Sequence, residues 1–288
     1  MTDEPTTRLR LDLAYDGTAF DGWARQSGQR TVQGELEAAL ATVLRRVGTA
    51  PTLVVAGRTD AGVHATGQVA HLDLSGAQLR HVVGRGDRDA AAALRARLNG
   101  IAGLRSDVVV HSVVVAPPGF DARFSPIWRS YEYRIADASA HRNPLLRGHT
   151  LWYPARLDEH AMNAATAELS GLHDWAAYCR PREGSTTIRE LQRFDWRRDD
   201  TEVLIATLRA DAFCHSMVRA LVGAAVAVGE GKLPGERMSA LRDQAARSNE
   251  FTVMPASGLT LVEVGYPPDS ELEARAAQTR ARRESPVQ

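Results

Sequence analysis

The sequence has a single lysine and only two cysteines. Because Lys232 stands alone, nearly every positive charge is arginine, a side chain that pairs bidentately with phosphate or carboxylate and stacks on bases. The same bias can reflect genome composition. Cys179 and Cys214 are too few for a disulfide framework or a four-cysteine zinc site. The scarcity of cysteine therefore excludes small disulfide-rich domains and four-cysteine zinc domains.

Net charge and long apolar runs are also lacking. Lys plus Arg (35) equals Asp plus Glu (35), so nucleic-acid binding would need locally clustered charge. The longest apolar stretch, Ala220 to Val228, is far shorter than the roughly 20 residues that span a bilayer. The acidic, polar start has no apolar segment of a secretory signal behind it. With 288 residues, 44% of them hydrophobic, the sequence predicts a soluble, cytoplasmic globular protein.

Hydrophobic periodicity divides the chain into two similar halves. Period-two alternation from Arg8 to Tyr15 predicts a strand, and helical spacing after Thr31 predicts a helix with Thr31 as its N-cap. Up to residue 115 the order is β-α-β-β-α-β, which is that of a ferredoxin-like unit, and a similar order follows Pro117-Pro118-Gly119. We predict an α+β fold of two ferredoxin-like (β-α-β-β-α-β) halves, with largely antiparallel sheets flanking a central catalytic cleft.

These breaks predict the domain boundaries. Residues 1–116 form the N-terminal ferredoxin-like domain, residues 117–268 the C-terminal one, and the charged residues 269–288 a frayed helix or disordered tail. The glycine-containing stretch Ser75–Arg88 is predicted to be a long loop. A helix starting near Asp89 is expected to stop at Asn99-Gly100.

The strongest chemical signal lies between two predicted strands, where residues 56–64 read Ala-Gly-Arg-Thr-Asp-Ala-Gly-Val-His. Two glycines bracket a tight connection, which would present Arg58 and Asp60 on one side of an extended stretch. The ordinary alternative is that Asp60 only caps a turn and pairs with Arg58, because Asp and Gly are common turn residues.

An arginine inside an apolar helix is the second signal. The predicted helix Ser216–Val228 is apolar almost all round and contains Arg219. A buried guanidinium needs a carboxylate partner, and Asp60 is one of few candidates. Alternatively, the side chain of Arg219 extends along the helix to solvent.

These and other motifs resemble the tRNA pseudouridine synthase A family, in order over most of residues 8–266. The matching segments are Tyr15-Asp16-Gly17 through Gly22-Trp23, residues 56–64, Gly67-Gln68-Val69, Asp121-Ala122-Arg123-Phe124-Ser125, Arg129-Ser130-Tyr131-Glu132-Tyr133 and Phe213-Cys214-His215-Ser216-Met217-Val218-Arg219. Ala24 departs from the pattern, since the family often has glutamine there. The resemblance therefore covers nearly the whole chain and includes the segments of both Asp60 and Arg219.

The resemblance implies an enzyme that isomerises uridine to pseudouridine at positions 38, 39 and 40 of the tRNA anticodon arm. It implies Asp60 as the nucleophile, Arg219 as the group that holds Asp60 in place, and Tyr131 as a catalytic ring that stacks on the uracil. The substrate-binding residues that it implies are Tyr131, Arg58, Gln68, Phe213 and His215. It further implies tRNA as the partner, a homodimer, and no metal or organic cofactor.

Two arginine-rich stretches are candidate phosphate contacts. They comprise Arg123, Arg129, Arg134, Arg142 and Arg147, and then Arg180, Arg182, Arg189, Arg193, Arg197 and Arg198. Any single one of these could equally lie on a solvated charged face. The histidines His64, His71 and His215 are more readily interpreted as hydrogen-bonded structural residues than as general bases.

Two other functions remain as alternatives on the residues alone. A non-catalytic RNA-binding protein would stack bases on exposed aromatic side chains of its sheets, and aromatics make up only 6% of this chain. A carboxylate-based glycoside hydrolase would need a second positioned acid, whereas Arg58 is the charged neighbour of Asp60. Both are less well supported than the synthase.

Overall fold

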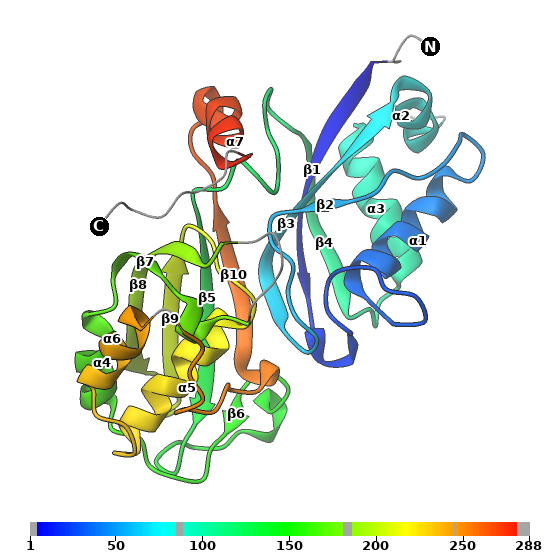
Figure 1. Ribbon diagram of the computed structural model, residues 1–288. Coiled ribbons are helices and arrows are strands. Elements are labelled where there is room, and N and C mark those ends of the chain that lie inside the picture. Colours follow the sequence, from blue (N-terminus) through cyan, green and yellow to red (C-terminus); the bar gives the residue numbers. More distant parts are fainter. Residues whose placement is uncertain (1–4, 85–88, 181–185, 245, 281–288) are drawn as a thin grey trace. The chain divides into compact units, whose positions relative to one another are not determined.

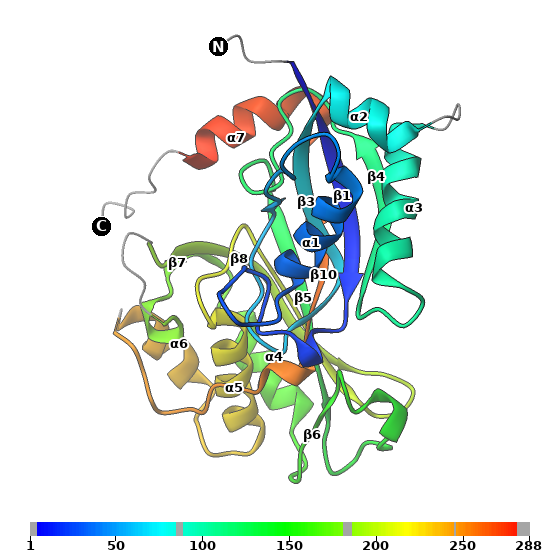
Figure 2. The same cartoon turned by 90° about the vertical axis from the view of Figure 1, so that its right-hand side faces the viewer.

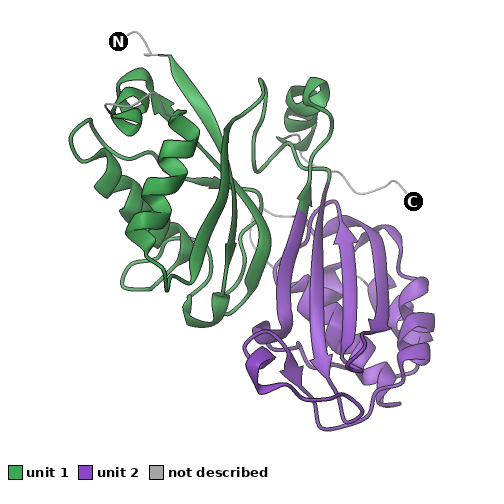
Figure 3. Cartoon of the chain, turned by 180° about the vertical axis from the view of Figure 1, so that it is seen from behind, with its two compact units in different colours: residues 1–127, 264–281 green, residues 128–263, 282–288 purple. Residues whose placement is uncertain are grey.

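The computed structural model describes residues 5–84, 89–180, 186–244 and 246–280, arranged in two compact units (Figure 1). Unit 1 holds the described residues of 1–127 and 264–281, and unit 2 those of 128–263 (Figure 3). The segment of residues 117–127 bonds to unit 1, where Arg8 Nη1 donates to the Phe120 carbonyl at 2.7 Å. Within the described residues, every helix is too short or too polar to cross a membrane.

Unit 1 is a small sheet with helices on one face. Its elements are β1 (Thr6–Tyr15), α1 (Val32–Leu44), β2 (Val54–Val55), β3 (His64–Ser75), α2 (Gly76–Val83), α3 (Ala90–Ala102), β4 (Val108–Val115) and α7 (Leu272–Arg280), with 3-10 turns at Gly17–Ala19 and Asp269–Glu271. The strands run in the order β4-β1-β3, all antiparallel, and β2 pairs with β3. Helices α1 to α3 cover one face (Figure 1). The alternation predicted for β1 is confirmed, because Leu9, Leu11 and Leu13 are fully buried.

Unit 2 has the same general construction. Its elements are β5 (Trp128–Ala136), β6 (Leu151–Trp152), α4 (Glu159–Ala167), β7 (Gly171–Asp174), β8 (Ile188–Arg198), β9 (Leu204–Ala210), α5 (Met217–Gly229), α6 (Glu236–Asp243) and β10 (Leu259–Gly265), with 3-10 turns at Pro144–Leu146, Ala176–Tyr178 and Ala256–Gly258. The sheet order is β10-β5-β9-β8-β7. Strands β5, β9, β8 and β7 are antiparallel, and β6 pairs in parallel with β5. Helices α4 to α6 lie behind this sheet in Figure 3.

The predicted mixed α+β fold with a mostly antiparallel sheet is confirmed, as is the helix start at Thr31, whose hydroxyl accepts from the Gly34 N–H at 3.2 Å. The long loop predicted over Ser75–Arg88 is wrong. Helix α2 begins there because Ser75 and Gln78 form a reciprocal capping box. Residues 85–88 lie outside the described part of the chain.

Helix α3 also differs from its prediction. It continues through Asn99 and Gly100 to Ala102, because the Asn99 amide bonds both the N–H and the carbonyl of Val110 in β4. Gly103, with a φ of +84°, follows its last residue. Residues 269–280, expected to be a frayed helix or disordered tail, form a 3-10 turn and α7, in which Leu272 and Ala276 are buried.

A pair of helical glycines tests the packing of α5. A Cβ at Gly223 would overlap the Thr252 carbonyl oxygen, whereas a Cβ at Gly100 in α3 would meet nothing within 4 Å. We expect Gly223→Ala to destabilise the protein by about 1–3 kcal/mol through overpacking. The matched change Gly100→Ala should leave stability equal or raise it by up to about 1 kcal/mol. Urea unfolding measures both, and equal free energies of unfolding for the two variants would contradict this packing.

Candidate active site

The loop of residues 56–63 connects β2 to β3 in unit 1 and carries the two charged residues of the central motif. Arg58 is exposed, Thr59 is buried at 6% exposure, and Asp60 is half-buried. The Val63 N–H donates to the Asp60 carbonyl at 3.2 Å, across a turn in which Gly62 has a φ of +78°. Arg58 and Asp60 flank the buried Thr59.

A buried hydrogen-bond network holds this loop from beneath. The Tyr15 hydroxyl lies 2.8 Å from Thr59 Oγ1 and accepts from Gln68 Nε2 at 3.1 Å. The same Gln68 nitrogen donates to the Gly57 carbonyl at 2.9 Å. Burial raises the pKa of Tyr15 to about 12, so its hydroxyl remains neutral at physiological pH. The backbone on the Arg58 side of the loop is therefore tied to β1 and β3.

The segment after β1 holds the other side of the loop. The Trp23 N–H donates to the Thr59 carbonyl at 3.0 Å, and the Gly62 N–H donates to the Phe20 carbonyl at 3.2 Å. This approach requires glycine at two positions. A Cβ at Gly17 would overlap the Val63 carbonyl oxygen, and one at Gly22, where φ is +92°, would lie 2.9 Å from the Thr59 oxygen.

These contacts explain several motif residues that sequence reasoning noted without a role. Gly17, Gly22 and Thr59 support the loop that presents Asp60. Gln68, expected from the resemblance to bind substrate, is fully buried and bonded to Tyr15 and Gly57. The sequence could show only that Gln68 belongs to a motif. Its bonding partners lie far from it in the chain, so these hydrogen bonds leave no local pattern.

Two histidines near the loop hold backbone groups. His64 is buried, and its Nδ1 accepts from the Gly17 N–H at 3.1 Å and lies at the same distance from a carboxylate oxygen of Asp16. On β3, His71 is 3% exposed, and its Nδ1 accepts from the Ala122 N–H at 3.0 Å. Both arrangements agree with the structural interpretation of these side chains.

Unit 2 brings together two of the expected substrate-binding residues. Tyr131 lies on β5 at 8% exposure, and its ring meets that of Phe213 edge-on, with centroids 5.2 Å apart and an interplanar angle of 89°. Phe213 follows β9, two residues before the exposed His215. The contact fixes the orientation of the Tyr131 ring.

Arg219 is half-buried in the first turn of α5, where its Nε donates to the Met254 carbonyl at 2.6 Å. The Met254 N–H in turn donates to the Arg219 carbonyl at 3.1 Å. These reciprocal bonds anchor the base of the guanidinium on unit 2. They argue against a side chain that simply extends along the helix into solvent.

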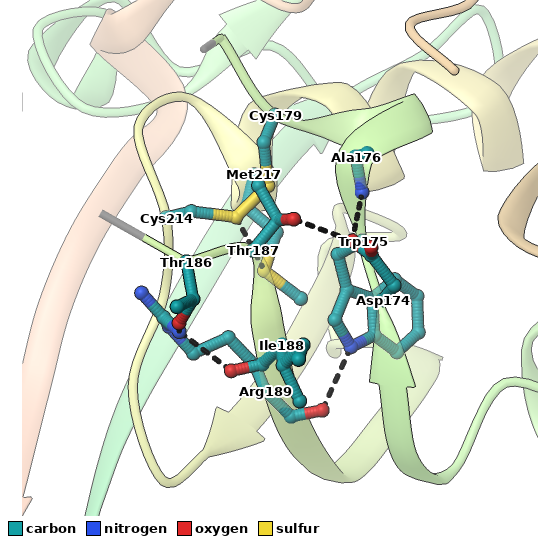
Figure 4. The surroundings of a disulfide bond; sticks show 10 residues. All are labelled: Asp174, Trp175, Ala176, Cys179, Thr186, Thr187, Ile188, Arg189, Cys214 and Met217. Carbon is teal, nitrogen blue, oxygen red and sulfur yellow. Dashed lines mark hydrogen bonds between the residues drawn. A yellow bond between two sulfur atoms is a disulfide. The ribbon is translucent and has the colours of Figure 1, made fainter. Parts of the chain in front are cut away.

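The structure joins Cys179 and Cys214 in a disulfide, which sequence analysis did not predict (Figure 4). Cys179 is buried at 2% exposure at the end of the 3-10 turn Ala176–Tyr178. The next residue, Arg180, donates its N–H to the His215 carbonyl at 2.9 Å. The segment that leads into α5 is thus fixed at two adjacent points. The neighbouring candidate phosphate contact Arg182 lies outside the described residues.

The arginine-rich stretches contain both paired and exposed side chains. Arg134 pairs with Asp199 and Arg198 with Asp137, each at 2.8 Å, and Arg193 pairs with Asp195. Such pairing directs these guanidiniums toward the protein. Arg193, although paired, is also exposed. The other exposed side chains are Arg123, Arg142, Arg147, Arg180 and Arg197.

Similarity to known proteins gives the class of this chain. A family model described as tRNA pseudouridine synthase matches residues 165–267. The chain is 59% identical to the tRNA pseudouridine synthase A of Leifsonia xyli subsp. xyli, covering 98% of this chain and 99% of the relative. It is 54% identical to that of Frankia casuarinae, covering 100% and 99%. These similarities define its class, an isomerase that forms pseudouridine in tRNA.

The chain belongs to the tRNA pseudouridine synthase A family. Among solved structures, an archaeal box H/ACA sRNP Nop10-Cbf5 complex matches with a TM-score of 0.31 and 10% identity, covering 76% of this chain and 44% of that one. At that level the structural likeness adds nothing to the sequence relationship.

His71 provides a test of the buried contacts beside β3. Burial, reinforced by the charge of Arg8, lowers its pKa from 6.5 to about 4. The unfolded chain therefore binds a proton between pH 6.5 and 4 that the folded chain does not, so this contribution to stability is present above pH 6.5 and is lost as the pH falls. We expect a slope of up to about 1.4 kcal/mol per pH unit from this group.

The control is His71→Asn, which keeps an acceptor for the Ala122 N–H but does not titrate. Unfolding by urea at several pH values between 4 and 7 measures the slope for both proteins. The variant should have the flatter profile. Identical slopes would show that the imidazole is not held in its neutral form.

Proposed function

We propose that the enzyme converts uridine to pseudouridine at positions 38, 39 and 40 of the tRNA anticodon arm, and that Asp60 is the nucleophile. The assignment of Asp60 as the nucleophile is supported by the construction of the loop of residues 56–63. Asp60 is half-buried at a turn whose flanks are fixed by buried hydrogen bonds, two residues from the exposed Arg58. A positioned, partly desolvated carboxylate is suited to covalent catalysis.

The reaction needs a nucleophile and a proton acceptor but no oxidant. The bond between ribose C1′ and uracil N1 breaks, the base turns, and a bond forms between C1′ and C5. The C5 proton is lost and N1 gains one, so atoms and electrons balance without a cofactor. Asp60 takes part in detaching the base, and the base is held while it turns.

Unit 2 supplies the other proposed roles. Tyr131 stacks on the uracil and assists removal of the C5 proton, and its contact with Phe213 supports this by fixing the ring. Arg219 pairs with Asp60 and holds it in place. Arg58 contacts the RNA and helps the target base leave its stack, which costs a few kcal/mol. Gln68 and His215 complete the proposed substrate-binding set.

The proposal also covers the arrangement of the strands and helices within each unit. The units are two ferredoxin-like halves flanking a central catalytic cleft, which the antiparallel order β4-β1-β3 with helices on one face supports for unit 1. On the family resemblance, the protein is further proposed to work in the cytoplasm as a homodimer. The partner is tRNA, bound through its anticodon arm.

Tritium release tests the nucleophile. With tRNA transcripts carrying 5-tritiated uridine, the wild type should release tritium as C5 loses its hydrogen. Asp60→Asn keeps the size of the side chain but removes the nucleophilic carboxylate. We expect release to fall by more than about a thousand-fold, the scale of loss seen when an enzyme loses its nucleophile, while tRNA affinity stays near that of the wild type.

Asp200→Asn is the matched control, because Asp200 lies on the exposed turn between β8 and β9. It should release tritium at the wild-type rate. Turnover by Asp60→Asn near that of the control would contradict the nucleophile. Release from transcripts that lack uridine at positions 38, 39 and 40 would contradict the assigned positions.

A further inference from the structure

The C-terminal helix α7 packs on the segment that follows β4, within unit 1 (Figure 2). Its first turn is buried through Leu272, whose carbonyl accepts from the Ser125 hydroxyl at 3.2 Å. One turn later, Arg275 Nε donates to the Pro126 carbonyl at 3.2 Å. The helix therefore lies directly against the Asp121–Ser125 motif.

The carboxylate of Asp121 organises this motif. One of its oxygens accepts from the N–H groups of Arg123 and Phe124, at 2.8 and 3.0 Å, which shapes the turn that carries Arg123. The other oxygen accepts from Arg280 Nη2 at 2.8 Å. Only 11% of the Asp121 side chain is exposed, and a buried carboxylate needs such a partner. Arg280, in the last turn of α7, supplies it.

The ring of Phe124 links the two arginines a second time. The guanidinium carbon of Arg123 lies 5.0 Å from the ring centroid, and that of Arg280 lies 4.9 Å from it. Both distances are within the range of cation–π attraction. Arg280 thus touches both groups, the carboxylate and the ring, that set the position of the exposed Arg123.

The anchoring of α7 does not depend on Arg280. Leu272 and Ala276 bury its apolar side, whereas the Arg280 side chain is 52% exposed. An ion pair of that exposure contributes little to stability. The ion pair between Arg280 and Asp121 matters for geometry instead, because the Asp121 carboxylate also holds the turn that carries the exposed Arg123.

We propose that Arg280 is a positioning residue for tRNA binding. Acting through Asp121 and Phe124, it holds the Arg123 guanidinium in the orientation that contacts a phosphate of the tRNA backbone. Arginine is suited to this because its planar fork matches a phosphate bidentately. The inference rests on the proposed function only in taking Arg123 as a phosphate contact, and it is independent of the nucleophile.

A double-mutant cycle tests the proposal, with KM, kcat and the dissociation constant for tRNA measured on each full-length protein. We expect Arg123→Ala and Arg280→Ala each to raise KM and Kd about five-fold with kcat unchanged, because uniform binding is lost. The double variant should bind no more weakly than Arg123→Ala alone, because Arg280 acts through Arg123. The salt dependence of binding should fall by about one unit in either single variant.

Arg95→Ala is the charge-matched control. Arg95 is an exposed arginine on α3 of the same unit, where it donates to the His111 carbonyl at 3.2 Å. It should leave KM unchanged. Additive losses in the double variant would show that Arg280 contacts the RNA independently and would overturn the proposal, as would a wild-type KM in Arg280→Ala.

A second variant covers the case in which Arg280→Ala lowers the melting temperature too far. Phe124→Leu keeps apolar volume but removes the ring that supports both guanidiniums, and it should raise KM by a similar factor. An unchanged KM would overturn the proposal. If wild-type protein bound tRNA without turnover, the proposed function would fail, while the binding cycle would still decide the role of Arg280.

Discussion

The position of Asp60 depends on one buried hydroxyl. Tyr15, at the end of β1, meets Thr59 on one side and Gln68 on the other, so the charged loop is tied to two neighbouring strands at once. In a low-dielectric interior such a network is strong when every member is paired and costly when one is lost. The position of the charged loop therefore rests on the buried polar groups beneath it.

Asp60 and Arg219, two residues of the proposed catalytic set, differ in what holds them. Asp60 follows a threonine whose side chain and carbonyl are both bonded within unit 1, and it precedes a glycine turn. Arg219 is anchored on unit 2 by the backbone of Met254. In each case the backbone or the stem of the side chain is fixed, which is how preorganised sites avoid reorganisation during reaction.

The features of the fold that were predicted correctly depend on short-range interactions. The alternation of Leu9, Leu11 and Leu13 and the cap at Thr31 both depend on residues close in the chain. Family resemblance supplied the remaining candidates. Tyr131 and Phe213 were both named from it, but their ring contact could not be read from two separate motifs.

One prediction missed a local signal, because α2 begins at the capping box of Ser75 and Gln78. The other differences involve distant partners, such as those of Asn99, which continues a helix because it bonds β4. The pairing of Cys179 with Cys214 likewise joins residues 35 positions apart. Sequence patterns predict local conformation, whereas the conformation of these residues depends on groups that only the fold brings near.

Unit 1 is interrupted in sequence by the whole of unit 2, and this has a consequence for synthesis. A ribosome completes residues 128–263 before it makes α7, so a nascent unit 1 exists for a time with its sheet but without its last helix. Domains generally fold as units during synthesis. The turn that carries Arg123 therefore acquires its support from α7 last, after the strands and the loop of Asp60 have been available to fold.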